Sequence, residues 1–397
     1  MISPRISRVL VGAASPPRFY RTGRGGDAAP TTPLTVFICL ILLVAVRVEA
    51  AGLSNDVLRT AFYQSIQAEK TQNYAGAIQS LTALGADANR YYTVQLRLGW
   101  LYYSSGKHAD AVKHYGAAIK LAPSSIEARL GCLQPLLAQS RYADVETVAK
   151  QIWQLDPKNY TANLRLATAY HLMKKDGSAN QILSQMSRYY PCDAGVLDER
   201  ISIPGHQPDP MTQKLRDKFS ESSRYEKTQN FTEAIKALES AQWGNYQDYC
   251  ANLRLSWLYY QTKDYAKSIR CAEVAIQAAP ESIEAKLGYV LPLLAQVRYA
   301  QAETVVNQVI ALDPGNYLAH LRLTSICRLR KDYPKADSEA AAMLVRYPAD
   351  VTFLTELALA RAAQGRTVDA HHLFQQVILL DPENFIARQF LERKPAH

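Results

Sequence analysis

The stretch QLRLGWLYYSSGKHADAVKHYGAAIKLAP, Gln95–Pro123, decides the fold of this chain. Its key positions are two small residues, two tyrosines and a closing proline, namely Gly99, Ala111, Tyr102, Tyr115 and Pro123. Small residues permit two helices to approach closely, aromatic rings fill the space beside them, and proline stops the second helix. The stretch therefore predicts a hairpin of two α-helices.

The pattern recurs with a period of 34 residues. The closing prolines are Pro123, Pro157, Pro191, Pro280, Pro314, Pro348 and Pro382. The small residues at the helix crossing are Ala77, Ala111, Val145 and Ala179, and then Ala234, Ser268, Ala302, Ala336 and Ala370. The step from Ala179 to Ala234 is 55 residues, so the frame is broken once by 21 extra residues.

The repeat resembles the tetratricopeptide repeat (TPR). The matched positions are Leu98, Gly99, Tyr102, Ala111 and Pro123, while Gln95 stands in the family's Trp slot and Tyr115 in its Phe slot. The resemblance implies an all-α, right-handed superhelical solenoid of about nine TPR helix hairpins, whose first helices line a concave groove.

A longer period shows that a four-repeat block is internally duplicated. EKTQN at 69–73 returns at 226–230, and WLYY at 100–103 returns at 257–260, each 157 residues later. We expect four domains or segments: 1–50 as a signal peptide or N-terminal anchor, 51–193 as a first TPR block, 194–214 as a linker or insertion, and 215–397 as a second TPR block ending in a capping helix over 385–393. Residues 194–210 contain three prolines and two glycines and favour a loop.

The first fifty residues predict a targeting signal. An Arg-rich leader precedes the 13-residue apolar run Leu34–Val46, which is shorter than the ~20 residues of a membrane span. Val48-Glu49-Ala50 then offers a cleavage point, so we expect an exported, periplasmic or secreted protein. Three alternatives stay open: an anchor through residues 34–46, an organellar transit sequence, and a wrongly assigned start codon. We expect membrane contact only through this segment.

The net charge of +9 does not indicate nucleic-acid binding. Residues 1–50, with six Arg against Asp27 and Glu49, supply +4 of it, and no Lys/Arg cluster with interleaved aromatics occurs elsewhere. The six cysteines show no C-x-x-C spacing, which favours small buried hydrophobes over a zinc site or a disulfide framework. If the protein is exported, Cys192 and Cys250 are the pair to test for a bridge. No catalytic motif is present, so we expect no enzyme, no cofactor and no metal.

Resemblance to other TPR proteins places a set of side chains in the groove: Thr93, Leu96, Trp100, Tyr103, Leu253, Trp257, Tyr260, Glu127 and Glu284. Such a surface suits an apolar peptide, a sugar ring or a cation, although the two tryptophans also fit as packing residues between repeats. Four arginines in an L-R-L context are possible anion contacts, or else solvated side chains along their own helices: Arg97, Arg165, Arg254 and Arg322.

The leading functional hypothesis is a non-catalytic scaffold in the cell envelope that binds another protein or peptide through its groove. The alternative is a carbohydrate-binding assembly factor in polysaccharide export, because aromatic pairs beside arginine suit an acidic glycan. A third possibility is a non-catalytic domain that serves an enzyme elsewhere in a complex. The sequence leaves open whether the two blocks bind one ligand or two.

Overall fold

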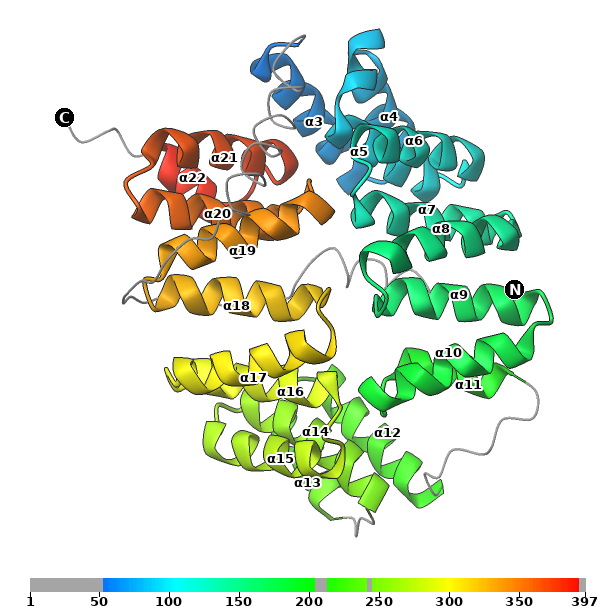
Figure 1. Cartoon of the computed structure of the whole chain (residues 1–397), viewed down its shortest axis with the longest axis vertical. Coiled ribbons are helices and arrows are strands. Elements are labelled where there is room, and N and C mark those ends of the chain that lie inside the picture. Colours follow the sequence, from blue (N-terminus) through cyan, green and yellow to red (C-terminus); the bar gives the residue numbers. More distant parts are fainter. Residues whose placement is uncertain (1–52, 204–212, 241–244, 393–397) are drawn as a thin grey trace. The chain divides into compact units, whose positions relative to one another are not determined.

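The computed structural model describes residues 53–203, 213–240 and 245–392 (Figure 1). Within these ranges the chain forms α-helices and one short 3-10 helix, η1 (Ala86–Arg90), and no strand. The predicted all-α repeat fold is therefore confirmed. The predicted signal or anchor segment lies outside the described residues. No helix in the described part is long and apolar enough to span a membrane.

Nine helix hairpins follow one another in the described ranges. They are α3 (Asn55–Lys70) with α4 (Tyr74–Thr82), α5 (Tyr92–Ser104) with α6 (His108–Leu121), α7 (Ile126–Ala138) with α8 (Tyr142–Leu155), α9 (Tyr160–Leu172) with α10 (Asp176–Tyr189), α12 (Gln213–Lys227) with α13 (Phe231–Glu239), α14 (Asn245–Gln261) with α15 (Tyr265–Ala278), α16 (Ile283–Ala295) with α17 (Tyr299–Leu312), α18 (Tyr317–Leu329) with α19 (Tyr333–Arg346), and α20 (Val351–Ala363) with α21 (Thr367–Leu380). Two single helices, α11 (Ala194–Ser202) and α22 (Phe385–Glu392), complete the order, and α22 lies where a capping helix is expected.

The chain divides into two compact units. Unit 1 comprises residues 1–139 and 323–397, and unit 2 comprises residues 140–322. In unit 1 the two segments pack on each other, because Leu379 of α21 joins the core cluster of Leu58 and Phe62 of α3. An ion pair between Lys70 and Glu383 also links these segments.

The helix crossings depend on small side chains. All nine crossing positions predicted from the 34-residue step have no exposed surface: Ala77, Ala111, Val145, Ala179, Ala234, Ser268, Ala302, Ala336 and Ala370. Gly99 and Gly131 are needed for a related reason. A Cβ atom on Gly99 would lie 2.8 Å from the ring of Tyr115, and one on Gly131 would lie 2.4 Å from it. Tyr115 thus fills the space between first helices α5 and α7.

Each hairpin turns through a single residue in the left-handed region. Two of these residues are Gly106 and Gly365, and the other seven are Gln72, Ser140, Lys174, Gln229, Lys263, Val297 and Lys331, with φ between 56° and 62°. The amide of the residue that follows it donates to a carbonyl in the last turn of the first helix; the Arg298 N–H, for example, donates to the Leu293 carbonyl at 2.9 Å. This tight turn sets the antiparallel helix pair.

The predicted loop at 194–210 is wrong for its first half, because Ala194–Ser202 forms α11. Asp193 caps this helix by accepting the Val196 N–H at 3.0 Å. Shifted by 157 residues, α11 falls on the start of α20, whose cap is Asp350. The motif P-x-D-x-x-x-L-x-E occurs at 191–199 and again at 348–356. The insertion therefore begins as the first helix of a fifth repeat. Residues 204–212 lie outside the described part.

Candidate functional site

Consecutive first helices are joined by ion pairs that the four-repeat duplication preserves. Arg97 of α5 donates to Glu69 of α3 at 2.8 Å and to Ser65 at 3.0 Å. In the second block Arg254 of α14 donates to Glu226 of α12 at 2.6 and 2.7 Å. Both arginines are therefore paired with a carboxylate of the preceding repeat. Their proposed role as anion contacts stays a prediction, and an incoming anion would compete with these acids.

The two remaining arginines of the predicted set lie beside tyrosines. Arg165 acts electrostatically on Tyr160, which is at the start of α9. Arg322 acts on Tyr260, where its positive charge opposes the burial that raises the pKa of that phenol. The structure thus brings together Tyr260 and Arg322, which the sequence placed in separate groups.

Trp100 and Trp257 occupy equivalent positions but have different surroundings. The indole N–H of Trp100 donates to Glu69 at 2.7 Å, and the ring packs against the core cluster of unit 1. Trp257 is 40% exposed, and its N–H meets no acceptor among the described residues. The two tryptophans differ because the neighbouring glutamates, Glu69 and Glu226, bind their arginines differently. Glu69 divides its oxygens between Arg97 and Trp100, whereas both oxygens of Glu226 accept from Arg254.

Trp257 is the centre of an aromatic and cationic patch in unit 2. Phe231 of α13 meets its ring edge-on at 6.0 Å between centroids. The Arg254 guanidinium carbon lies 5.5 Å from the ring centroid. Tyr260, one helical turn further on, contacts Tyr265 at 5.8 Å. We call these residues, Phe231, Arg254, Trp257 and Tyr260, the Trp257 surface. In unit 1 the equivalent tyrosine, Tyr103, is half-buried between Trp100 and His108.

Glu127 accepts hydrogen bonds from two distant parts of unit 1. The hydroxyl of Tyr92 on α5 donates to it at 2.9 Å, and the backbone N–H of Ala349, just before α20, donates at 3.1 Å. Leu96 packs against the apolar cluster around Tyr92 and Ala349. Burial and the nearby Asp350 carboxylate raise the pKa of Glu127 to about 7.

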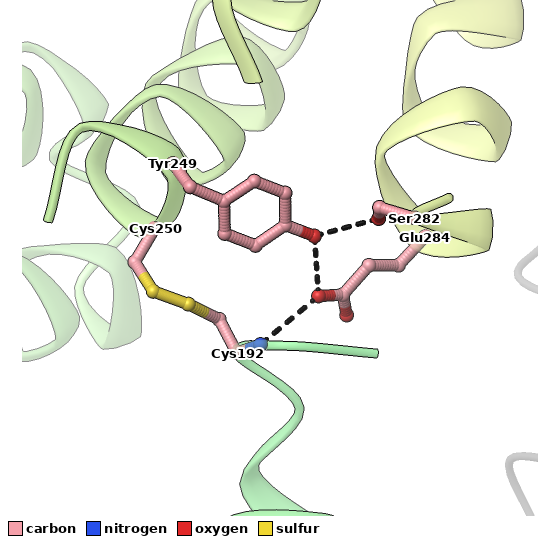
Figure 2. The surroundings of a disulfide bond; sticks show 5 residues. All are labelled: Cys192, Tyr249, Cys250, Ser282 and Glu284. Carbon is pink, nitrogen blue, oxygen red and sulfur yellow. Dashed lines mark hydrogen bonds between the residues drawn. A yellow bond between two sulfur atoms is a disulfide. The ribbon is translucent and has the colours of Figure 1, made fainter. Parts of the chain in front are cut away.

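Glu284 repeats this arrangement in unit 2, as Figure 2 shows. Tyr249 donates to it at 2.6 Å and the N–H of Cys192 at 3.2 Å. Tyr249 also lies 2.7 Å from the hydroxyl of Ser282. Burial raises the pKa of Glu284 to about 7. Leu253 packs against the cluster formed by Tyr249 and Cys250.

Cys192 and Cys250 form a disulfide with Cα atoms 5.8 Å apart (Figure 2). The expectation that the cysteines are small buried hydrophobes is therefore wrong for this pair, although it holds for the buried Cys132 and Cys327. The bonded pair is the one singled out on the assumption of export. At the positions equivalent to this disulfide, unit 1 has Ala349 and the buried Thr93.

Sequence reasoning missed Tyr92 and Tyr249, which hold the two glutamates. Tyr92 is the first residue of α5 and Tyr249 is the fifth residue of α14; both lie outside the positions assigned to the groove, and they are 157 residues apart. That exact recurrence was the available signal. Within the described residues no group of three or more His, Cys, Asp or Glu side chains is placed to hold a metal ion.

Three family models described as tetratricopeptide repeat match the chain, over residues 93–125, 136–196 and 220–283. The chain is a tetratricopeptide repeat protein. No curated protein matches this TPR chain in sequence.

Solved structures resemble the TPR chain over part of its length. MamA of Desulfovibrio magneticus RS-1 has a TM-score of 0.40 and 17% identity, over 44% of this chain and 99% of that one. YrrB, described as a TPR protein with an unusual peptide-binding site, has a TM-score of 0.37 and 14% identity, over 46% of this chain and 97% of that one. A chain of the APC/C hetero-tetramer Cut9–Hcn1 has a TM-score of 0.39 and 13% identity, over 84% of this chain and 62% of that one.

Proposed function

We propose that this TPR protein is a non-catalytic scaffold that binds another protein or peptide through the first helices of its second block. The observation that carries the proposal is Trp257, which is 40% exposed and whose N–H has no acceptor among the described residues, while Trp100 at the equivalent position is held by Glu69. One copy of the duplicated residue packs between repeats, and the other is left for a ligand.

The chemistry of the Trp257 surface suits a polypeptide. Tryptophan, tyrosine and arginine are the residue types that contribute most to protein interfaces, because a large flat ring buries much area at little conformational cost. An apolar side chain of the partner would pack on the rings of Trp257 and Phe231. A backbone carbonyl of the partner would accept the indole N–H. The exposed ring would supply apolar contact area to the partner, and the hydrogen bond from the N–H would fix the partner's orientation.

A carbohydrate is the second candidate, since a sugar ring also stacks on an exposed indole. The case for an acidic polysaccharide is weaker. Arg254 already neutralises Glu226 through two hydrogen bonds, so it offers no net charge to an incoming carboxylate. Arg97 is also paired with an acid, through one hydrogen bond to Glu69. We therefore favour a protein partner.

We place this function outside the reducing cytosol. The Cys192–Cys250 disulfide supports export, because such bonds persist in oxidising compartments. The apolar run 34–46, with its Arg-rich leader, is the segment that would direct export or anchor the chain. The cell envelope satisfies both features.

A two-part binding assay discriminates the ligand classes. The full-length protein and its Trp257→Ala variant are applied to glycan arrays and, in parallel, used to capture proteins from a cell-envelope extract, with Val274→Ala on α15 as an exposed control. We expect no binding signal on the glycan arrays. We expect the wild type and Val274→Ala to capture a defined protein that Trp257→Ala does not capture. Glycan signals that vanish with Trp257→Ala would replace the protein hypothesis by the carbohydrate one.

A further inference from the structure

Two contacts bring together repeats that are far apart in sequence, and the duplication relates them. In unit 1 Glu127, at the start of the third repeat, accepts the N–H of Ala349, at the start of the ninth. In unit 2 Glu284, at the start of the seventh repeat, accepts the N–H of Cys192, which follows the fourth. Adding 157 to 127 and to 192 gives 284 and 349. We call these two hydrogen-bonded pairs the closure contacts.

Neither carboxyl has a basic partner among the described residues. Glu127 faces Asp350 and the phenols of Tyr92 and Tyr115. The basic residue on its own helix, Arg129, donates to the Ser125 carbonyl at 2.6 Å instead. Each closure contact therefore holds a half-buried acidic group with only neutral donors.

The same holds for the second closure contact. Glu284 faces Asp193 and the phenols of Tyr249 and Tyr190. Lys286, the basic residue on α16, donates to the Pro280 carbonyl. The charges around the two glutamates are thus alike, and the acids Asp350 and Asp193 are themselves equivalent helix caps.

One covalent difference separates the two contacts. In unit 2 Cys192, which donates its N–H to Glu284, forms a disulfide with Cys250. Cys250 follows Tyr249, which donates its hydroxyl to the same glutamate. In unit 1 Ala349 and Thr93 stand at these positions, so hydrogen bonds and apolar packing alone hold the contact. The protein therefore contains one closure contact that a disulfide cross-links and one that only non-covalent interactions hold, so the two can be compared in the same molecule.

We propose that the closure contact between Glu127 and Ala349 is stronger at acidic than at alkaline pH. The equivalent contact between Glu284 and Cys192 instead stays closed at either pH until a thiol reductant cleaves the disulfide. In the closed contact the neutral carboxyl needs little solvation and still accepts from the tyrosine and the N–H. The carboxylate, by contrast, loses hydration that it regains only when the contact opens.

The direction of the effect follows from linkage. A carboxyl whose pKa is about 7 when closed and about 4.5 when open binds its proton more tightly in the closed contact. The closing equilibrium is therefore strongest below pH 4.5 and weakens as the pH rises through 7. The equilibrium constant for closing each contact falls about 300-fold over the whole titration, and about 30-fold between pH 5.5 and pH 8.5.

Reduction converts the second contact to the behaviour of the first. A dithiol reductant supplies two electrons and two protons, the S–S bond breaks, Cys192 and Cys250 become thiols, and the dithiol becomes a cyclic disulfide. Glu284 then holds the Cys192 segment by hydrogen bonds alone, as Glu127 holds Ala349.

Hydrogen exchange of single amides in the full-length protein tests this proposal. Protection of the Ala349 and Cys192 amides, corrected for intrinsic exchange rates, is measured at pH 5.5 and 8.5 with and without a dithiol. We expect Ala349 protection to fall about 30-fold with rising pH in both redox states. We expect Cys192 protection to change less than about threefold when oxidised and to fall about 30-fold when reduced.

Glu127→Gln and Glu284→Gln are the matched variants, because the amide keeps an acceptor oxygen and cannot titrate. Glu127→Gln should abolish the pH dependence at Ala349 and leave that at reduced Cys192 intact, and Glu284→Gln should do the reverse. If either variant fails to fold, the wild-type comparison of the two amides still decides. Equal Ala349 protection at both pH values, pH dependence that survives Glu127→Gln, or an oxidised Cys192 amide that loses protection as Ala349 does would each overturn the proposal.

Discussion

Glu69 accepts the indole N–H of Trp100 at 2.7 Å and so joins the first helices of the first two repeats. The equivalent acid in the second block, Glu226, gives both of its oxygens to Arg254. The same residue types thus produce a packed tryptophan in unit 1 and an exposed one in unit 2. Trp100 therefore has a packing role between repeats, and the exposed Trp257 is the residue proposed to bind a partner.

This division predicts unequal effects of removing the two indole N–H groups. Trp100→Phe leaves an oxygen of Glu69 without its donor in a partly buried site, and we expect a loss of about 1–2 kcal/mol in unfolding free energy. Trp257→Phe should stay within about 0.5 kcal/mol of the wild type, because the indole is 40% exposed and its N–H has no acceptor among the described residues to lose. Thermal unfolding followed by circular dichroism makes the comparison. Equal losses would show that both tryptophans belong to the core.

Gly131 and Gly288 are equivalent positions with opposite tolerance for a methyl group. A Cβ on Gly131 would meet the Tyr115 ring at 2.4 Å, while one on Gly288 has its nearest neighbour, a methyl of Leu253, at 3.9 Å. Gly131→Ala should destabilise the protein by about 1–3 kcal/mol. Gly288→Ala should be neutral or stabilising by up to about 1 kcal/mol, since alanine is the better helix former. Urea denaturation of the two variants checks the sign of each change.

Val297 is a β-branched residue at φ 60° in the turn between α16 and α17, and it is 65% exposed. The left-handed conformation costs an L-residue roughly 1–2 kcal/mol, and glycine avoids this strain at some cost in chain entropy. We expect Val297→Gly to raise the unfolding free energy by about 0.5–1 kcal/mol. Gly106→Val, in the corresponding turn of the second repeat, should lower it. A melting temperature that falls for both variants would refute the strain argument.

The disulfide predicts a thiol count. Cys132, Cys271 and Cys327 are free, so a denatured chain that begins at Ala51 should label at three thiols without reduction and at five after it. Removing the cross-link with Cys192→Ala/Cys250→Ala should destabilise unit 2 by about 4 kcal/mol, the value for a loop of 58 residues. Labelling followed by mass spectrometry gives the count. Five thiols before reduction would exclude the bond.

The repeat frame was predictable because every hairpin repeats one packing solution. The 34-residue step places the crossing positions correctly, from Ala77 to Ala370, since a larger side chain there would separate the helices. The helix at Ala194–Ser202 was missed because prolines and glycines later in the insertion dominated its composition. Comparison with 348–356 would have found it, because Asp193 and Asp350 are the same helix cap.

The closure contacts could not be predicted from sequence patterns within a repeat. Glu127 and Ala349 are 222 residues apart, and nothing in the spacing within a repeat indicates that they meet. The difference between Trp100 and Trp257 was equally hidden, because it arises from how Arg97 and Arg254 orient on their acids rather than from the residue types. That the remaining groove positions bind a ligand stays a prediction.

Site-specific photo-crosslinking at position 257 tests the central claim most directly. A photoreactive phenylalanine replaces Trp257 in the full-length protein in its native cells, and a second chain carries it at Val274, which is 41% exposed on α15. We predict one defined polypeptide cross-linked at 257 and absent at 274, whose purified form binds Trp257→Ala at least tenfold more weakly than the wild type. No cross-linked polypeptide at 257, or unchanged affinity in the variant, would contradict the account.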